Sequence, residues 1–178
     1  MKKNLMRILC AAIALIMAAA VMTSCKKDEN APPDGMKEAF TETSSFRFYV
    51  PERWTVEFSE GIPGAYYSTS DPSSVSVAAW ELVHTDDTVD TWWEQNVSDL
   101  SMVMKDFELV KTENLTVDGV YAKAYIYTAS LGEMNYKFEQ VACVKNTVVY
   151  LFTYTSLADN FDKHAEDVAK MLENWKLN

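Results

Sequence analysis

The sequence predicts an α+β domain built around a largely antiparallel β-sheet, and three observations lead to this fold class. Four long strand patterns follow one another between residues 107 and 155, separated by turns short enough for hairpins. The strand patterns at 74–82 and 147–155 are mainly apolar in both alternating sets, which is typical of strands covered on both faces. Two amphipathic helix patterns, near residues 89–104 and 160–175, can supply that cover.

Length and composition fit one globular domain. The chain has 178 residues, of which 48% are hydrophobic and 24% are charged. It is too short for a multidomain enzyme and too apolar for a disordered chain.

The chain begins with a pattern typical of a secretory signal peptide. Lys2, Lys3 and Arg7 are basic, and an apolar run covers residues 8–22. This run is shorter than the roughly 20 residues that a membrane-spanning helix needs, so a permanent transmembrane helix is the weaker alternative.

The end of this run, Met22-Thr23-Ser24-Cys25, resembles the lipobox of bacterial lipoproteins, although Met22 stands where leucine is usual. The resemblance implies that Cys25 carries a diacylglyceryl group and becomes the first mature residue. The alternative is an ordinary signal peptide in which Cys25 is incidental.

We therefore predict a signal peptide over 1–24, a lipid anchor and flexible tether over 25–44, and one domain over 45–178. The expected location is the bacterial cell envelope. The protein would be anchored on the outer side of the cytoplasmic membrane, or at the outer membrane if the host has two membranes.

Charge and cysteine content narrow the functional classes. Loss of residues 1–24 removes three basic and no acidic residues, which changes the net charge from −10 to −13. Such a surface repels nucleic-acid phosphates and anionic lipid headgroups. Cys10 leaves with the signal peptide, and Cys143 has no second free thiol to pair with, so we expect it in the core.

The first half of the domain contains short strands and one helix. Strands are expected at 46–50 and 55–58, joined as a hairpin through Pro51, and at 65–69 and 74–82. The helix begins near Val89, with Thr88 or Asp87 as its cap. Trp92 and Trp93 flank its apolar stripe, which favours packing onto a sheet, with an exposed aromatic ridge as the alternative.

In the second half of the domain we expect strands at 107–117, 120–129, 134–145 and 147–155, followed by a helix from about Asn160. Within the first helix, Asn96 falls near the middle of the apolar stripe. A buried amide there is expected to bond to nearby backbone or water, with a functional polar contact as the alternative.

Short motifs resemble a known family. Phe48-x-Val50-Pro51-x-x-Trp54 looks like the opening of the PsbP-like and Mog-like domains, residues 117–122 resemble their central turn into a long strand, and 161–177 resemble their closing helix. The resemblance implies a three-layer α/β/α sandwich around the sheet. Members of the family assist photosystem assembly or bind a small GTPase, so it also implies accessory binding rather than catalysis.

The candidate chemical residues are few. His84, Asp86, Asp87 and Asp90 could together bind a divalent cation weakly. We prefer the alternative that Asp87 and Asp90 cap free amides and interact with the helix dipole at the start of the helix, which explains them without a metal. His164 fits a packing role better than that of a catalytic base. No zinc-ligand pair, phosphate-binding loop or nucleophile elbow is present in the sequence.

Two functional hypotheses follow. The first is a membrane-tethered, non-catalytic domain that binds a protein partner at the envelope, with no cofactor and no catalytic residue. The alternative is a domain that binds a small ligand or a divalent metal between sheet and helix, with enzymatic activity as an extension.

Overall fold

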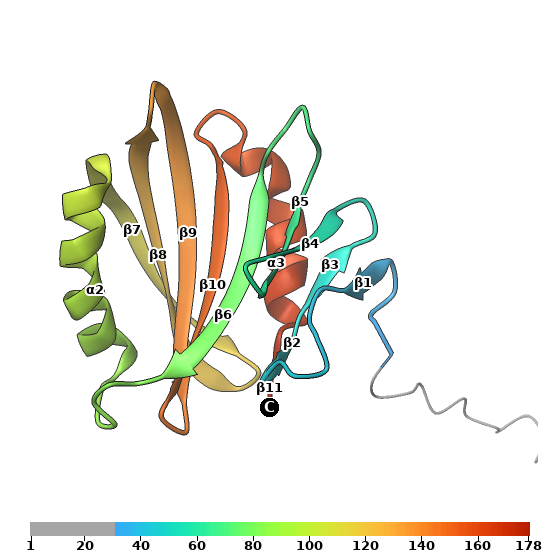
Figure 1. The fold of residues 1–178 in the computed structure, drawn as a ribbon, viewed down its shortest axis with the longest axis horizontal. Helices are drawn as coiled ribbons and strands as arrows, with labels where there is room; N and C mark the ends of the chain where they lie inside the picture. Colours follow the sequence, from blue (N-terminus) through green and yellow to red (C-terminus); the bar gives the residue numbers. More distant parts are fainter. Residues whose placement is uncertain (1–30) are drawn as a thin grey trace, which may run out of the picture. The chain divides into compact units, whose positions relative to one another are not determined.

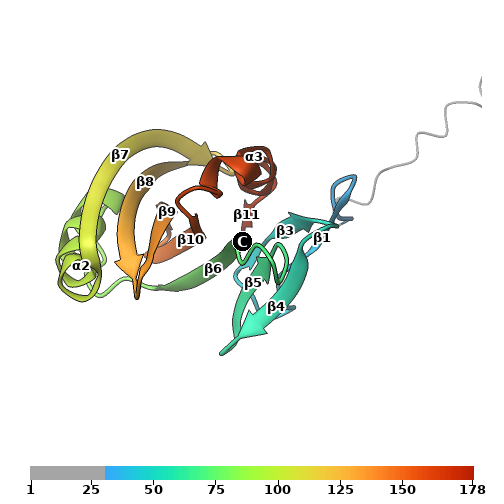
Figure 2. The same cartoon turned by 90° about the horizontal axis from the view of Figure 1, so that it is seen from above.

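The structure is a computed structural model in which residues 31–178 are described. Its main element is a seven-stranded sheet in which all neighbouring strands run antiparallel (Figure 1). The strand order is β4 (Thr55–Ser59), β5 (Ile62–Tyr66), β6 (Ser74–Glu81), β10 (Val148–Leu157), β9 (Met134–Lys145), β8 (Val120–Leu131) and β7 (Lys105–Val117). The long strands bend strongly along their length (Figure 2).

The four long strands are consecutive neighbours in the sheet, as the sequence predicted. The turn between β7 and β8 shows why this part was predictable. Asp118 and Gly119 have φ angles of 50° and 77°, and two successive residues with positive φ form the tight turn whose twist matches an antiparallel pair. The Asp-Gly pair therefore fixes the hairpin locally.

The short N-terminal strands pair differently from the prediction. β1 (Met36–Glu38) pairs with β3 (Tyr49–Pro51), and β2 (Phe46–Arg47) pairs with the last strand, β11 (Lys176–Leu177). β4 pairs with β5 instead, so the predicted hairpin between 46–50 and 55–58 is wrong. The predicted strand at 65–69 is displaced and begins at Ile62.

The folded part of the chain begins before residue 45, where the predicted domain starts. Met36 and Ala39 are buried in the core, and β1 lies within the segment predicted as a tether. The hydrogen bond from Ala39 N to Phe48 O ties this segment to the domain over 2.9 Å. The predicted anchor, Cys25, and the predicted signal peptide lie outside the described residues.

Two helices accompany the sheet: α2 (Val89–Val103) and α3 (Ala165–Glu173), the latter preceded by a 3₁₀ turn, η1 (Phe161–His164). Each helix belongs to a separate buried cluster. The α2 cluster consists of Leu82, Val89, Trp92, Trp93, Tyr125, Tyr127, Ala129, Phe138, Ala142 and Val149. The α3 cluster includes Phe48, Trp54, Val77, Ala124, Val141, Phe152, Val168, Met171 and Trp175.

Adjacent residues along β8 alternate between these clusters, with Ala124 in the α3 cluster and Tyr125 in the α2 cluster. Because side chains alternate between the faces of a strand, the two clusters lie on opposite faces of β8. Within residues 31–178, no helix is both long enough and apolar enough to cross a membrane.

Candidate functional site

The candidate site arises because one helix has to cover a wide sheet face. A helix with its side chains is about 10–12 Å across, and neighbouring strands lie about 4.8 Å apart, so α2 alone covers two or three strands. α2 lies over the side of the sheet that holds β7, β8 and β9 (Figure 1). On the same face, Ser76 and Ala78 of β6 and Thr153 of β10 remain partly exposed.

A groove runs beside α2 where this cover ends. Its volume is about 250 Å³, and it is lined by Trp80, Trp92, Trp93, Asn96, Asp99, Leu100, Val103, Gln140 and Leu151. The lining comes from α2 and from three strands, β6, β9 and β10. Only one charged side chain, that of Asp99, is among the lining residues of this described groove.

The tryptophans differ in their roles. Trp92 and Trp93 are each only 6% exposed, and Trp93 stacks on Tyr125 with ring centroids 3.8 Å apart and an interplanar angle of 7°. The packing interpretation of the helix stripe is therefore confirmed for both. Trp80 of β6 is 40% exposed, and its ring centroid lies 5.9 Å from that of Trp92.

Trp80 is one of several groove residues that were not predicted from the sequence; the others include Asp99, Gln140 and Leu151. Trp80 belongs to the apolar set of a strand that we expected to be covered on both faces. The alternation of side chains along the strand places Trp80 on the same face as Ala78. It does not show how many strands of that face the helix covers.

Polar groups sit within the groove at a few positions. Asn96 donates a hydrogen bond from Nδ2 to the backbone oxygen of Trp92 over 2.7 Å, which confirms the expected backbone partner. Gln140 makes a long contact of 3.4 Å from Nε2 to Thr153 Oγ1. The oxygen atoms of both amides and the exposed carboxylate of Asp99 have no hydrogen-bond partner among the described residues, so they are available to a ligand.

The four residues of the predicted weak metal site do not converge. Asp87 Oδ1 accepts hydrogen bonds from Thr91 Oγ1 and Gln95 Nε2, each at 3.1 Å. Asp90 Oδ1 lies 2.5 Å from Lys123 Nζ on β8. His84 and Asp86 are exposed, and the described residues contain no group of three or more His, Cys, Asp or Glu side chains placed to hold a metal ion.

Helix capping accounts for part of this segment. Thr88 is the N-cap of α2: its Oγ1 accepts a hydrogen bond from Thr91 N over 3.2 Å, while Thr88 N donates to Thr91 Oγ1 over 2.8 Å. Asp90 lies in the first turn, where a negative charge interacts favourably with the helix dipole. Of the two predicted caps, Thr88 is therefore correct.

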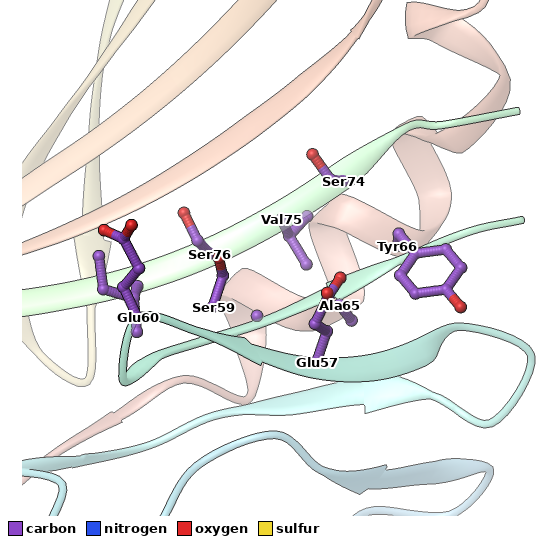
Figure 3. Close-up of a pocket in the computed structure, with 10 residues that line it drawn as sticks. Glu57, Ser59, Glu60, Ala65, Tyr66, Ser74, Val75 and Ser76 are labelled. Carbon is purple, nitrogen blue, oxygen red and sulfur yellow. The ribbon is translucent and has the colours of Figure 1, made fainter. Parts of the chain in front are cut away.

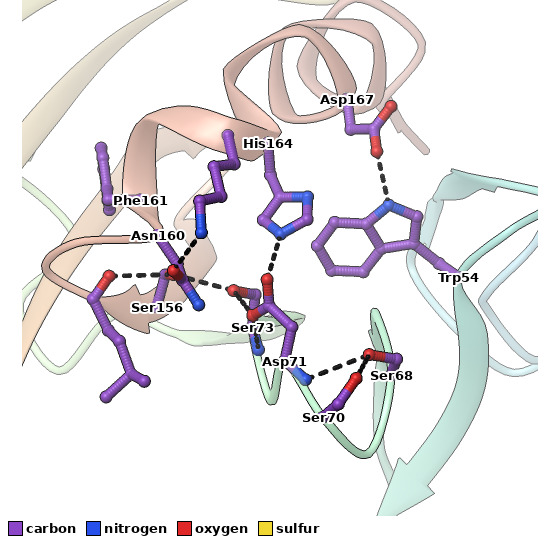
Figure 4. A network of polar contacts seen from close by, with 12 residues as sticks. Trp54, Ser68, Ser70, Asp71, Ser73, Ser156, Asn160, Phe161, His164 and Asp167 are labelled. Carbon is purple, nitrogen blue, oxygen red and sulfur yellow. Dashed lines mark hydrogen bonds and ion pairs between the residues drawn. The ribbon is translucent and has the colours of Figure 1, made fainter.

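A second polar cluster ties the β5–β6 loop to α3 (Figure 4). His164 Nε2 lies 3.0 Å from Asp71 Oδ2, and the imidazole packs against the rings of Trp54 and Tyr67. Asp71 Oδ1 accepts hydrogen bonds from Ser73 N and Ser73 Oγ at 3.2 and 2.6 Å. These contacts of Asp71 hold the β5–β6 loop against η1, the turn that precedes α3. His164 is buried as a packing residue, as predicted.

The electrostatics of Asp71 follow from these contacts. Burial raises the pKa of its carboxyl group, but hydrogen bonds from Ser73 and His164 to the ionised form outweigh burial and lower the pKa to about 2. On α3, the fully buried Asp167 pairs with Arg53 and accepts a 2.7 Å hydrogen bond from Trp54 Nε1. Both carboxylates are thus occupied by structural partners.

A further hollow of about 290 Å³ lies along β4, β5 and β6 (Figure 3). Its acidic residues, Glu57 and Glu60, lie apart in Figure 3 and no histidine or cysteine lines this part of the described chain. Gly64 lets β5 approach β6 closely, since a Cβ atom there would lie 2.6 Å from Val75 O. The hollow therefore follows from strand packing.

Cys143 is a core residue, as predicted. It is free, fully buried on β9 and part of the α3 cluster. Burial raises the pKa of its thiol to about 12, with only a small opposing effect from Lys145. A neutral, inaccessible thiol is a poor nucleophile.

Comparison with known proteins identifies the fold. No family model matches the chain, and no curated protein matches its sequence. Among solved structures, LpqN of Mycobacterium tuberculosis, involved in cell envelope biogenesis, is similar at a TM-score of 0.63 and 14% identity, covering 80% of this chain and 90% of that one.

Cyanobacterial PsbP (CyanoP) from Synechocystis sp. PCC 6803 is similar at a TM-score of 0.58 and 14% identity, covering 84% of this chain and 96% of that one. A Pseudomonas aeruginosa protein of unknown function, PA94, described as a putative regulator, matches at 0.55 and 15% identity, covering 78% and 94%. The chain therefore has a PsbP-like fold of mostly antiparallel sheet with two helices. At these identities the likeness concerns the fold alone.

Proposed function

We propose that this protein is a lipid-anchored, non-catalytic accessory protein that binds a protein partner at the outer side of a bacterial membrane. The main support for a binding role is the groove beside α2. It is lined by the exposed Trp80, by mostly apolar side chains and by one carboxylate, that of Asp99. The structural likeness to LpqN, which is involved in cell envelope biogenesis, and to PsbP supports an accessory role. In the proposal, the two helices and the sheet form the three-layer sandwich, supported by the two separate clusters.

Chemistry favours binding over catalysis at this groove. General acid–base catalysis needs a group that can exchange a proton close to the reacting atoms, and nucleophilic catalysis needs an activated hydroxyl, thiol or amine. The groove offers the exposed carboxylate of Asp99 and two amides. Indole rings, aliphatic side chains and a few polar groups are instead typical of binding sites.

The anchor is tested by Cys25→Ala, with Cys143→Ala as a matched control that removes the buried cysteine instead. Both variants are expressed at full length in a bacterial host that is fed an alkyne fatty acid, and membrane fractions are compared. Wild type and Cys143→Ala should carry the label and sediment with membranes, whereas Cys25→Ala should carry none. Equal labelling of Cys25→Ala would overturn the lipid-anchor part of the proposal.

The accessory role is tested in the same cells. Cross-linking in intact cells, followed by purification of the protein, should recover an envelope protein in the wild type and much less of it with Cys25→Ala. The acidic mature chain predicts that this association weakens as the salt concentration rises. Turnover of a small substrate by the purified protein, with no partner recovered, would favour the enzymatic alternative.

A further inference from the structure

The apolar surface does not stop at the groove. At the C-terminal end of α2, Val103 is 79% exposed and forms one wall of the groove. β7 begins two residues later and pairs Lys105 with Ser130, so this end of the helix lies beside the β8–β9 turn. Leu131 and Met134 in that region are also exposed, and both belong to the alternating sets of β8 and β9 that face α2.

The groove also has a definite length. It extends along α2 from Trp92 to Val103, which at 1.5 Å per residue is about 17 Å. An extended peptide advances about 3.3 Å per residue, so the groove accommodates about five residues of a partner. Its volume of about 250 Å³ falls below the range of roughly 300–1,000 Å³ typical of small-molecule sites.

The charged side chains that α2 itself carries are all acidic. α2 carries Asp90, Glu94 and Asp99 and has no lysine or arginine between residues 89 and 103. Asp90 is paired with Lys123, whereas Asp99 stands at the groove with no ion-pair partner among the described residues. A cation bound in the groove would be attracted by the carboxylate of Asp99, and one placed over the exposed indole of Trp80 would make a cation–π contact.

We propose that this groove, deepening the function proposed above, binds a short segment of a partner protein that places one or two large apolar side chains between Trp80, Leu100 and Leu151, with a lysine or arginine against Asp99. A pocket for an apolar anchor ringed by polar groups is the common arrangement of an interface hot spot. Charge complementarity selects a basic-flanked segment over an acidic one.

The chain contains one competing segment of the same chemistry. Lys2, Lys3 and Arg7 precede the apolar run at 8–22. If the chain's own leader occupied the groove, cross-links would map to residues 1–24 and not to another protein. The experiment therefore has to determine the sequence of the cross-linked peptide, because detecting a cross-link alone does not distinguish a partner from residues 1–24.

Site-specific photo-cross-linking tests the proposal in cells that express the full chain. p-Benzoylphenylalanine replaces Val103 on the groove wall or, as a control, the exposed Val110 on β7, outside the groove. After irradiation, mass spectrometry identifies the cross-linked peptide. We expect the Val103 position alone to yield a peptide of another protein that contains large apolar residues next to lysine or arginine.

Charge reversal provides the second arm. Asp99→Lys should reduce the Val103 cross-link at least about tenfold, whereas Glu94→Lys, which makes the same charge change on α2 away from the groove, should change it less than about twofold. Trp80→Ala should reduce it as well. Both charge variants alter exposed helix residues, and unchanged thermal unfolding of the purified proteins confirms that they fold.

The remaining outcomes overturn the groove proposal. These are absence of a Val103 cross-link, equal cross-linking from Val110, equal effects of Asp99→Lys and Glu94→Lys, or adducts with lipid, a second copy or residues 1–24. Failure of the wider function is distinguishable, because it appears as loss of fatty-acid labelling or of partner recovery irrespective of the cross-linking position. Labelling and recovery without a groove cross-link leave the accessory role intact and place the interface elsewhere.

Discussion

The contact between Asp71 and His164 predicts a pH-dependent contribution to stability. The carboxyl pKa of Asp71 is lowered from 3.8 to about 2, because hydrogen bonds from Ser73 and His164 outweigh the effect of burial. At about 1.36 kcal/mol per pKa unit, the ionised carboxylate stabilises the folded state by about 2 kcal/mol at neutral pH. Since the folded-state pKa is the lower one, this stability is present above pH 3.8 and is lost as the pH falls through about 2.

Urea unfolding of the wild type and Asp71→Asn, followed by tryptophan fluorescence between pH 2 and 7, measures this contribution. The difference in the free energy of unfolding should be about 2 kcal/mol at pH 6 and should shrink to a few tenths near pH 2. Asp86→Asn, at an exposed aspartate in the β6–α2 loop, should differ from the wild type by less than about 0.5 kcal/mol. A difference for Asp71→Asn that stays constant over this pH range would refute the assignment to the ionised carboxylate.

Three further predictions concern the packing and capping of the fold. Gly64→Ala should cost about 1–3 kcal/mol in urea unfolding, because the new methyl group would overlap Val75 O; a neutral effect would contradict the close approach of β5 and β6. Thr88→Ala should cost about 1 kcal/mol and Thr88→Ser much less, since serine keeps the N-cap hydroxyl; equal losses would exclude the capping bond. Cys143 should react with a thiol reagent only at the rate of unfolding, since burial raises its pKa to about 12, and rapid modification of the native protein would contradict its burial.

The parts of the fold that the sequence predicted are those with local determinants. The long hairpins depend on turns such as Asp118-Gly119, whose residue types favour positive φ. α2 begins at Thr88 because a threonine hydroxyl satisfies a free backbone amide of the first turn. In both cases the deciding interaction lies within a few residues of the element.

The parts that were predicted wrongly depend on partners far apart in the chain. Phe46 pairs with Leu177, and Met36 pairs with Pro51, while a strand pattern contains no information on which strand it will adjoin. The segment around β1 is mainly polar and shows no periodic spacing of apolar residues. Its Met36 is nevertheless buried, in a cluster with residues of other strands and of α3. Tertiary contacts thus override a weak local pattern.

The candidate site was only partly visible in the sequence for a geometric reason. Residue alternation assigns Trp80 and Leu151 to the α2 side of their strands, but exposure depends on how much of a seven-stranded face one helix covers. Trp92 and Trp93 are buried because they point from the helix into the sheet, whereas Trp80 lies at the margin of that cover. Whether a tryptophan on this face is buried in the core or exposed in the groove therefore depends on how the helix and the sheet assemble.

The same geometry indicates which residues should distinguish this protein functionally from others with its fold. Any sheet of this width with a single helix on one face leaves some strands partly uncovered, so a bare margin is a property of the topology and not of a function. The chemistry of the margin is set by the side chains that fill it, here Trp80 and Leu151 on the strands and Asp99 on the helix. A related fold with small or basic residues at these three places would lose the proposed binding surface. Of the three, Leu151 also packs against the α2 cluster, whereas Trp80 and Asp99 lie outside both fully buried clusters and are the positions where such a change affects the core least.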